Sequence, residues 1–302
     1  MMQQSDRAGL LFALAGFCTL SIGDVVVKGM DGMWPSTGIA MLRYTLAAIG
    51  LSALLAWKGG AASLLAMPRA GIQWLRGLGV ALATVAFFTG VWLMPLADAM
   101  AITFVQPMLT AVLATMFLGE RLKSYTIVAI VVAFTGVLMV LRPNFAVIGW
   151  GALLPLVAAL GMAILMTANR AAAGAASALA MQAYIANTAS VLLIAACAIG
   201  HFSGVEEFRL SWPSLGVIVR CAIVACTATC AHLMIYLGTT RAGASTVAPM
   251  TYGQLLAAIA LGWIFFAEVP DALTLLGSAI IVGAGLFLWA MGRKRVIGEA
   301  PS

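Results

Sequence analysis

An internal repeat constrains this chain more than any other feature. Residues of the first half recur in the second half at a constant offset of 148 positions, as between 84 and 232 or between 120 and 268. The matched pairs are Ala83 and Ala231, Thr84 and His232, Phe88 and Tyr236, Gly90 and Gly238, Thr103 and Thr251, Gln106 and Gln254, Glu120 and Glu268, and Leu138 and Leu286. The repeated unit is made of apolar segments, and duplicated membrane units whose halves face opposite ways are characteristic of secondary transporters.

The composition places the whole chain in a lipid bilayer. Of its 302 residues, 63% are hydrophobic and only 9% are charged, which is too little polar surface for a soluble protein of this length. Spans of about 20 apolar residues are expected at about 8–30, 35–57, 71–93, 97–118, 124–141, 148–168, 177–199, 214–240, 242–266 and 272–291. We therefore expect an all-α integral membrane protein of about ten transmembrane helices, built as two five-helix repeats over residues 1–143 and 148–295.

The net charge of +6 reports membrane topology rather than a nucleic-acid partner. If the N-terminus is cytoplasmic, the inner side receives Arg7, Lys58, Arg69, Arg76, Arg121, Lys123, Arg170, Arg241, Arg293, Lys294 and Arg295, whereas the outer side receives Lys28, Arg142, Arg209 and Arg220. This asymmetry follows the positive-inside rule. We expect a multi-pass protein of the cell inner (plasma) membrane with both termini in the cytoplasm. Because five is an odd number, the second repeat is inverted, with Glu120 at the inner surface and Glu268 at the outer surface.

The cysteines and the N-terminus carry no further chemistry. All five cysteines fall inside predicted helices, and Cys226 and Cys230 lie one turn apart without a histidine or carboxylate at zinc-site spacing. They are expected to pack between helices, so no metal and no cofactor are predicted. The first span is longer than a signal-peptide core and lacks a convincing cleavage site, so we expect it to be retained.

Two glutamines lie near the middle of the bilayer, in the fourth and ninth spans. Gln106 and Gln254 each fall roughly 12–18 Å inside their helices at 1.5 Å per residue. Their amides either line a central substrate cavity or make structural hydrogen bonds between helices, and both interpretations remain open. Pro107 and Pro249 interrupt the same spans, so these spans are candidate gating helices, with a simple kink as the alternative.

Aromatic and polar residues share one face of the third and eighth spans. Thr84 and Phe88, like His232 and Tyr236, lie one turn apart, and Trp92 extends the first pair. Such a wall suits a flat, partly apolar ligand, while ordinary packing is the competing interpretation of each residue. The predicted substrate-binding residues are Thr84, Phe88, Trp92, Gln106, His232, Tyr236, Tyr252 and Gln254.

Two charges are predicted inside the membrane, Asp24 in the first span and Arg43 in the second. Intramembrane charges are costly unless paired, so they mark a functional hypothesis by default. Either Asp24 and Arg43 form a permanent pair, or they remain available to the ammonium and carboxylate of a ligand. The centre of the first span, from Gly16 to Thr19, has no acidic residue suited to proton-coupled export of a cation, so a neutral or zwitterionic solute is favoured.

These residues resemble the EamA branch of the drug/metabolite transporter superfamily. The resemblance covers nearly the whole chain and is carried by Met41 to Tyr44, by Pro95 to Ala99, by Gln106 with Pro107, and by Leu118 to Arg121. It implies a basket-like ten-helix fold, alternating access and cytoplasmic termini. Some members of this family, such as exporters of the YddG type, carry aromatic amino acids. The second repeat departs from the pattern because it has Leu255 where the first has Pro107.

The sequence therefore favours a transporter over an enzyme. We expect export of small neutral or zwitterionic metabolites such as amino acids, including aromatic ones. The alternative within transport is uptake or proton-coupled exchange of a vitamin or cationic drug. An integral membrane enzyme or a scaffold is the alternative of another class, against which stands the absence of a nucleophile–base motif and of a phosphate-binding loop. The expected partners are a small-molecule solute and the lipid bilayer, and monomer and homodimer both remain open.

Overall fold

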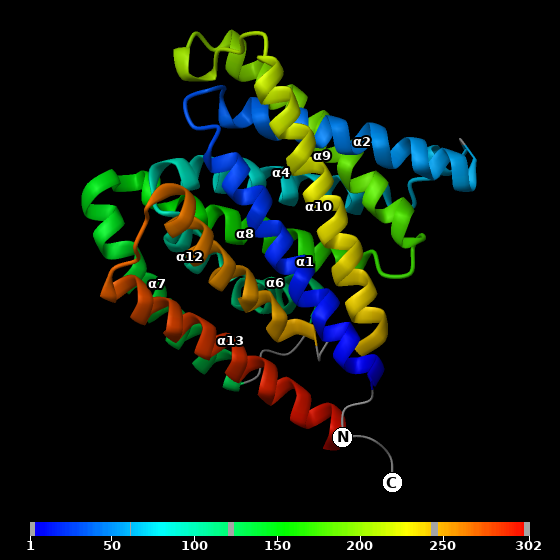
Figure 1. The fold of residues 1–302 in the computed structure, drawn as a ribbon. Coiled ribbons are helices and arrows are strands. Elements are labelled where there is room, and N and C mark those ends of the chain that lie inside the picture. The colour runs from blue at the N-terminus through cyan, green and yellow to red at the C-terminus, as the bar shows by residue number, and fades with distance from the viewer. Residues whose placement is uncertain (1–3, 61, 120–123, 243–246, 299–302) are drawn as a thin grey trace.

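The structure, a computed structural model, describes residues 4–60, 62–119, 124–242 and 247–298. These residues form helices and connecting turns, without a β-strand among them (Figure 1). Glu120, Arg121 and Lys123 lie outside the described residues. The all-α fold class predicted from the sequence is confirmed.

Ten helical segments are long and apolar enough to cross a membrane, as predicted. Three of them are built from two consecutive pieces. The segments are α1 (Gln4–Lys28), α2 (Ser36–Gly59), α4 (Ala70–Leu93), α5 (Leu96–Thr103) with α6 (Gln106–Leu118), α7 (Ser124–Ile148), η1 (Gly149–Leu153) with α8 (Leu154–Ala171), α9 (Ala178–Phe202), α10 (Leu215–Ala242), η3 (Ala248–Thr251) with α12 (Tyr252–Phe266), and α13 (Ala272–Gly298). The short helices α3 (Ala62–Leu65) and η2 (Glu206–Phe208) lie in connections between them.

Local signals in the sequence set several helix ends. α6 begins around Pro107, which needs no backbone donor in the first turn, and ends at Gly119, whose φ of 68° lies in the left-handed region that glycine favours. α9 begins after Ser177, whose hydroxyl accepts a hydrogen bond of 3.3 Å from the backbone N–H of Ala180. These ends fix where one span stops and the chain turns back.

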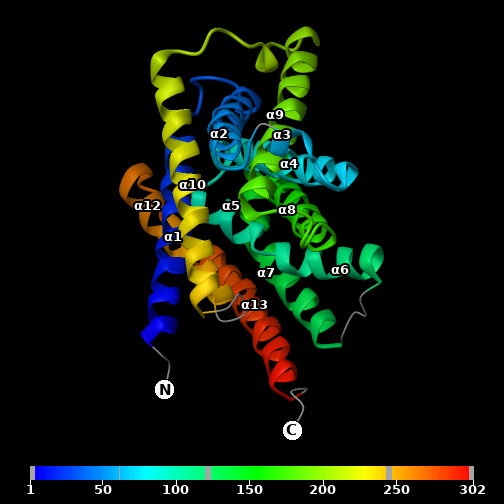
Figure 2. The same ribbon diagram turned by 90° about the vertical axis from the view of Figure 1, so that its right-hand side faces the viewer.

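The packing of the helices is symmetric between the first five spans and the last five. α1 packs on α10 and α12, and the equivalent helix α8 packs on the equivalent partners α4 and α6. Likewise α2 contacts α10 where α9 contacts α4, while α2 with α9 and α7 with α13 are pairs of equivalent helices (Figures 1 and 2). Exchanging each helix for its counterpart leaves these contacts in place, which is the relation expected between two-fold related halves.

Glycines bring the backbones of equivalent helix pairs into contact. A Cβ added at Gly16 of α1 would lie 2.8 Å from the carbonyl oxygen of Ala231, and one at Gly161 of α8 would lie 2.7 Å from the nitrogen of Ala83. Ala83 and Ala231 are partners in the sequence repeat, so the two contacts are counterparts. Small residues permit this approach, which supplies dispersion contacts between helices in lipid.

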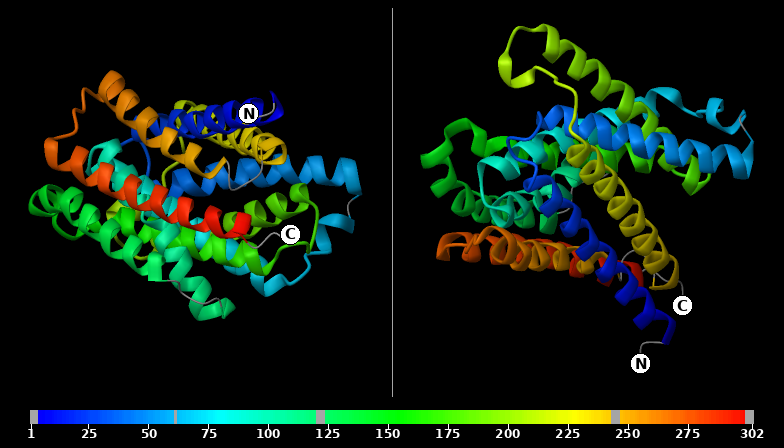
Figure 3. Two further views of the ribbon diagram at one scale, coloured as in Figure 1. Left: turned by 90° about the horizontal axis from the view of Figure 1, so that it is seen from below. Right: turned by 45° about the horizontal axis from the view of Figure 1, so that its top comes forward.

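The pair α7 and α13 packs in the same way, as Figure 3 shows from below. A Cβ at Gly277 would lie 2.6 Å from the carbonyl oxygen of Gly136. Small residues one turn apart in the sequence, Ala129 with Ala133 and Ala279 with Gly283, predict that these helices pack through them. Ala129 and Ala133 are buried, but Ala279 and Gly283 are exposed, so that part of the prediction is wrong. The contact face of α13 is rotated onto Gly277, where the backbones meet.

We predict that Gly161→Ala destabilises the protein, whereas Gly283→Ala does not. The added methyl group at position 161 meets backbone atoms 2.6–2.7 Å away, while nothing lies within 4 Å at position 283. Overpacking of this kind costs about 1–3 kcal/mol. Thermal unfolding of the detergent-solubilised variants measures the difference, and equal melting temperatures for the two would contradict the backbone contact between α4 and α8.

Candidate functional site

Two clusters of polar side chains inside the bundle contain the charges that bear on the candidate site. One, which we call the central cluster, consists of Asp24, Arg43, Tyr44, Thr84 and Gln254. The other, which we call the outer knot, is formed by Lys28 and Glu268 together with backbone groups at the junction of α4 and α5. The two differ in how their charges are satisfied.

In the central cluster, Asp24 of α1 is tied to the ninth span. The Nε2 group of Gln254 donates a hydrogen bond of 3.3 Å to Oδ2 of Asp24, and the hydroxyl of Ser21 donates one of 2.9 Å to the carbonyl oxygen of Gln254. Asp24 and Gln254 are both half-buried. Gln254 therefore makes an interhelical hydrogen bond that positions the carboxylate of Asp24 between α1 and α12.

Arg43 of α2 lies over aromatic rings rather than against an acid. Its guanidinium carbon is 4.8 Å from the ring centre of Tyr44 and 5.6 Å from that of Phe88. The hydroxyl of Tyr44 lies 3.2 Å from that of Thr84, and this hydrogen bond fixes the ring of Tyr44. Among the described residues no acceptor receives a hydrogen bond from Arg43, so its five N–H donors are held in place by cation–π contacts alone.

Asp24 and Arg43 do not form the permanent ion pair that was one of the two sequence interpretations. Within the described part of the chain the ion pair observed is that of Lys28 with Glu268. The physical reason is the packing: α1 makes its principal contacts with α10 and α12, not with its sequence neighbour α2. The opposite charges remain within electrostatic range of each other.

The predicted aromatic wall is only partly formed. Thr84 and Phe88 are buried, with 7% and 3% of their surfaces exposed, and serve to support Tyr44 and Arg43. The ring of His232 is exposed, lies within electrostatic range of Arg43, and places Nδ1 2.6 Å from the carbonyl oxygen of Ala228 one turn earlier. Tyr236 lies in α10, and its side chain is outside the described part of the structure.

Both interrupted spans carry the predicted breaks. α5 ends at Thr103 and α6 begins at Gln106, next to Pro107; η3 contains Pro249 and gives way to α12 at Tyr252. The rings of Phe104 and Tyr252 lie 5.5 Å apart, so the two breaks are in contact. Gln106 is half-buried. That these breaks act as gates stays a prediction.

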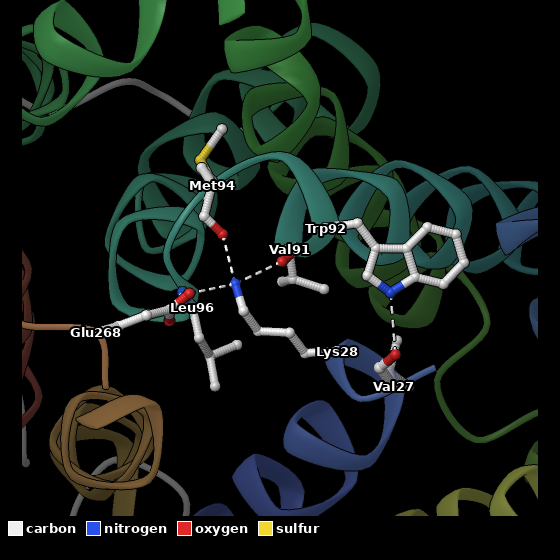
Figure 4. Close-up of polar contacts among 7 residues, drawn as sticks. All are labelled: Val27, Lys28, Val91, Trp92, Met94, Leu96 and Glu268. Carbon is white, nitrogen blue, oxygen red and sulfur yellow. Dashed lines mark hydrogen bonds and ion pairs between the residues drawn. The ribbon is translucent and has the colours of Figure 1, made fainter. Parts of the chain in front are cut away.

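The outer knot satisfies two helix ends with one ion pair (Figure 4). The ammonium of Lys28 lies 2.6 Å from Oε1 of Glu268 and donates hydrogen bonds of 2.7 Å to the carbonyl oxygens of Val91 and Met94. Oε2 of Glu268 accepts a hydrogen bond of 2.9 Å from the backbone N–H of Leu96. A cation at the C-terminal end of α4 and an anion at the N-terminal end of α5 also suit the dipoles of these helices.

Trp92 belongs to this knot and not to the central cluster. Its indole N–H donates a hydrogen bond of 3.0 Å to the carbonyl oxygen of Val27, next to Lys28 (Figure 4). The sequence placed Lys28 and Glu268 among the charges at the outer surface and missed their contact. The sequence did contain one indication of this contact. An acidic residue is repeated at 120 and 268, and a charge at the end of a span needs a partner of opposite charge.

Arg76, which the sequence interpretation assigns to the inner side, is buried in the bundle. Only 3% of its surface is exposed. Its Nε donates to Oδ1 of Asn169 at 2.5 Å, and its guanidinium also bonds to Gln73 and to the carbonyl oxygen of Met181. Arg76 therefore joins α4, α8 and α9 as a buried structural group.

Known proteins similar to this chain are membrane transporters. The profile of the EamA-like transporter family matches residues 7–142. The chain is also 26% identical to a pseudopaline exporter of Pseudomonas aeruginosa, over 93% of this chain and 96% of that protein. Residues 7–142 therefore carry an EamA-like domain. The resemblance to EamA-type proteins of the drug/metabolite transporter superfamily is confirmed, and the protein is a membrane transporter.

Further relatives share this length and differ in their named solutes. An S-adenosylmethionine uptake transporter of Rickettsia bellii is 25% identical over 93% of this chain and 92% of its own. A riboflavin transporter of Rhizobium johnstonii is 26% identical over 95% of this chain and 92% of its own. A solved crystal structure with 15% identity has a TM-score of 0.57 over 96% of this chain and 98% of that one, which supports the fold alone.

We predict that the single change Lys28→Met destabilises the protein more than the double change Lys28→Met with Glu268→Gln does. The single change leaves a largely buried carboxylate without its cation, which costs about 3–5 kcal/mol, while the double change removes both charges. Thermal unfolding of wild type, both single variants and the double variant closes the cycle. Additive losses in the double variant would show that the pair contributes no coupling.

Proposed function

We propose that this transporter exports small neutral or zwitterionic metabolites, such as amino acids and in particular aromatic ones, by alternating access across the inner membrane. The solute binds at the central cluster. The proposal depends on one observation: among the described residues, Arg43 has no acid in an ion pair with it, Asp24 accepts a hydrogen bond from the amide of Gln254, and the two charges lie within electrostatic range of each other.

The charges of the central cluster match those of a zwitterion. The N–H donors of Arg43 suit a carboxylate, which binds guanidinium by charge-assisted hydrogen bonds, and Asp24 suits an ammonium group. A ligand that carries both groups has no net charge, so it neutralises both protein charges without bringing a new one into the membrane. The half-buried ring of Tyr252, which lies 5.5 Å from the buried ring of Phe104, is the aromatic surface proposed to meet an apolar side chain.

The alternating movement is assigned to two related five-helix units, residues 1–143 and 148–295. The symmetric packing of the helices supports this division, and the family profile ends at residue 142. The two interrupted spans lie at corresponding places of the units, as in transporters whose broken helices meet at the binding site. Their breaks at Pro107 and Pro249 are the proposed gates.

The orientation in the membrane rests on the charges of the connections. The connections and chain ends assigned to one side of the membrane carry Arg7, Lys58, Arg69, Arg170 and Arg241. By the positive-inside rule this side faces the cytoplasm.

Uptake or proton-coupled exchange of a vitamin or cationic drug is the competing function, and named relatives include uptake and vitamin transporters. Arg43 disfavours a cationic solute because its charge has no acid partner to neutralise it. A vitamin without a carboxylate would leave the N–H donors of Arg43 unused. The same cluster therefore separates the candidate solutes by charge.

We predict that Arg43→Gln impairs binding of a carboxylate-bearing solute about 10- to 100-fold, because a hydrogen bond to a charged group contributes about 1.5–3 kcal/mol. The measurement is counterflow of labelled phenylalanine into proteoliposomes, as the concentration giving half-maximal rate. Arg241→Gln is the matched control, since its guanidinium also lies over a ring, 4.7 Å from Phe12, but at the exposed end of α10.

Several results would count against this assignment. Unchanged half-saturation in Arg43→Gln would remove Arg43 from the binding site, and equal losses in both arginine variants would indicate a general effect of charge. If no amino acid shows counterflow above empty liposomes, amino acids are not the substrate. A screen of nucleosides and vitamins by thermal shift then identifies the class that stabilises the folded protein.

A further inference from the structure

Asp98 of α5 is a buried carboxylate with one unsatisfied oxygen. Only 5% of its surface is exposed. The amide Nδ2 of Asn144 donates a hydrogen bond of 2.6 Å to Oδ2 and another of 2.9 Å to the carbonyl oxygen of Val140. Oδ1 is buried and has no hydrogen-bond partner among the described residues. The amide thus fixes one oxygen of Asp98 and leaves the other bare.

The charged groups that face Asp98 are all acidic. Glu268, which follows α12, and Asp271, which precedes α13, both act on it electrostatically, and the hydroxyl of Thr274 of α13 is a hydrogen-bonding neighbour of its carboxyl group. From α1, Lys28 reaches the region, but its ammonium is taken by Glu268 and by two backbone carbonyls. No cation of the described parts of α4, α7 or α8 forms an ion pair with Asp98. Within the described part of the chain, Asp98 therefore has no cation partner.

Protonation of Asp98 would remove the unfavourable buried charge. An ionised carboxylate buried beside two other acids, with an oxygen that receives no donor, is costly, whereas a proton on Oδ1 removes the charge. The amide of Asn144 can donate to Oδ2 in either form. Ionisation becomes favourable only when water or a cation reaches Oδ1, which requires movement of α5 relative to α7 and α13.

The position of Asp98 connects this requirement to the transport movement. Asp98 precedes the end of α5 at Thr103 by little more than one turn, so it lies on the outer piece of the interrupted fourth span. The backbone N–H of Leu96, two residues earlier, is held by Glu268 of the outer knot. Any shift of α5 against the knot changes the surroundings of Asp98.

We propose that Asp98 is a proton-binding site that couples solute export to proton entry. This inference rests on the proposed transport function. In each cycle Oδ1 of Asp98 takes a proton from the outer water and delivers it to the inner water, while one solute molecule moves outward. The amide of Asn144 positions the carboxyl group throughout.

The test compares two modes of transport in proteoliposomes. Counterflow at equal pH on both sides needs no net proton movement, whereas a gradient with an acidic interior drives accumulation of labelled phenylalanine only if protons leave as the solute enters. We expect wild type to show both modes. Asp98→Asn, which mimics the protonated state, keeps counterflow near the wild-type rate, but its accumulation falls to the level seen without a gradient.

The matched control is Asp31→Asn, an exposed carboxylate of the turn after α1, which is expected to keep gradient-driven accumulation. A proton ionophore abolishes the accumulation by wild type and by this control. Gradient-driven accumulation that survives in Asp98→Asn would overturn the proton site. Wild-type counterflow without any effect of the gradient would overturn it too, while leaving the proposed transport function intact.

A readout without solute keeps the two proposals separate. Infrared difference spectra of the purified protein between acidic and alkaline pH are expected to contain a carboxylic-acid band that disappears in Asp98→Asn and persists in Asp31→Asn. If Asp98→Asn does not fold, Asp98→Glu assigns the band by shifting it. Absence of such a band overturns the proton site even if no solute is found, whereas absence of counterflow for every solute overturns the transport proposal alone.

Discussion

Close contact between helix backbones is the interaction on which the rest of this structure depends. In a bilayer no hydrophobic force draws helices together, so dispersion contacts through small side chains must do so. Gly16 and Gly161 provide these contacts on the counterpart helices α1 and α8. Gly136 and Gly277 provide them between α7 and α13, which are counterparts of each other. By fastening α1 to α10 rather than to α2, they hold Asp24 and Arg43 apart, and the charges of the central cluster stay unpaired.

The outer knot and the central cluster differ in whether their charges are neutralised. At the outer knot every donor of Lys28 and both oxygens of Glu268 are satisfied, so the ion pair fastens the ends of α1, α4 and α5. In the central cluster Arg43 rests on rings and Asp24 accepts from an amide, which positions each charge without neutralising it. A satisfied charge pair stabilises a fold, whereas positioned but unneutralised charges leave energy available for a ligand.

The sequence predicted the parts of this architecture that are encoded locally. Apolar length marks the ten spans, and Pro107 and Pro249 mark two breaks because proline removes a backbone hydrogen bond wherever it stands. It could not predict contacts that depend on which helices are neighbours. The hydrogen bond of Asp24 to Gln254 and the pair of Lys28 with Glu268 join residues more than 200 positions apart, and the burial of Arg76 follows from the packing of α8 and α9 on α4.

The two halves share a frame but not its charges. Since Gly16 and Gly161 make equivalent contacts, α8 follows α1 at an offset of 145 positions, which aligns Asp24 with Asn169. Asp24 accepts from Gln254, yet Asn169 accepts from Arg76. The two halves thus share this backbone geometry, while an acid of one half corresponds to a neutral amide in the other. In the transport that we propose, a dipolar solute between such halves meets different groups on its two sides, so the charge asymmetry gives it one orientation.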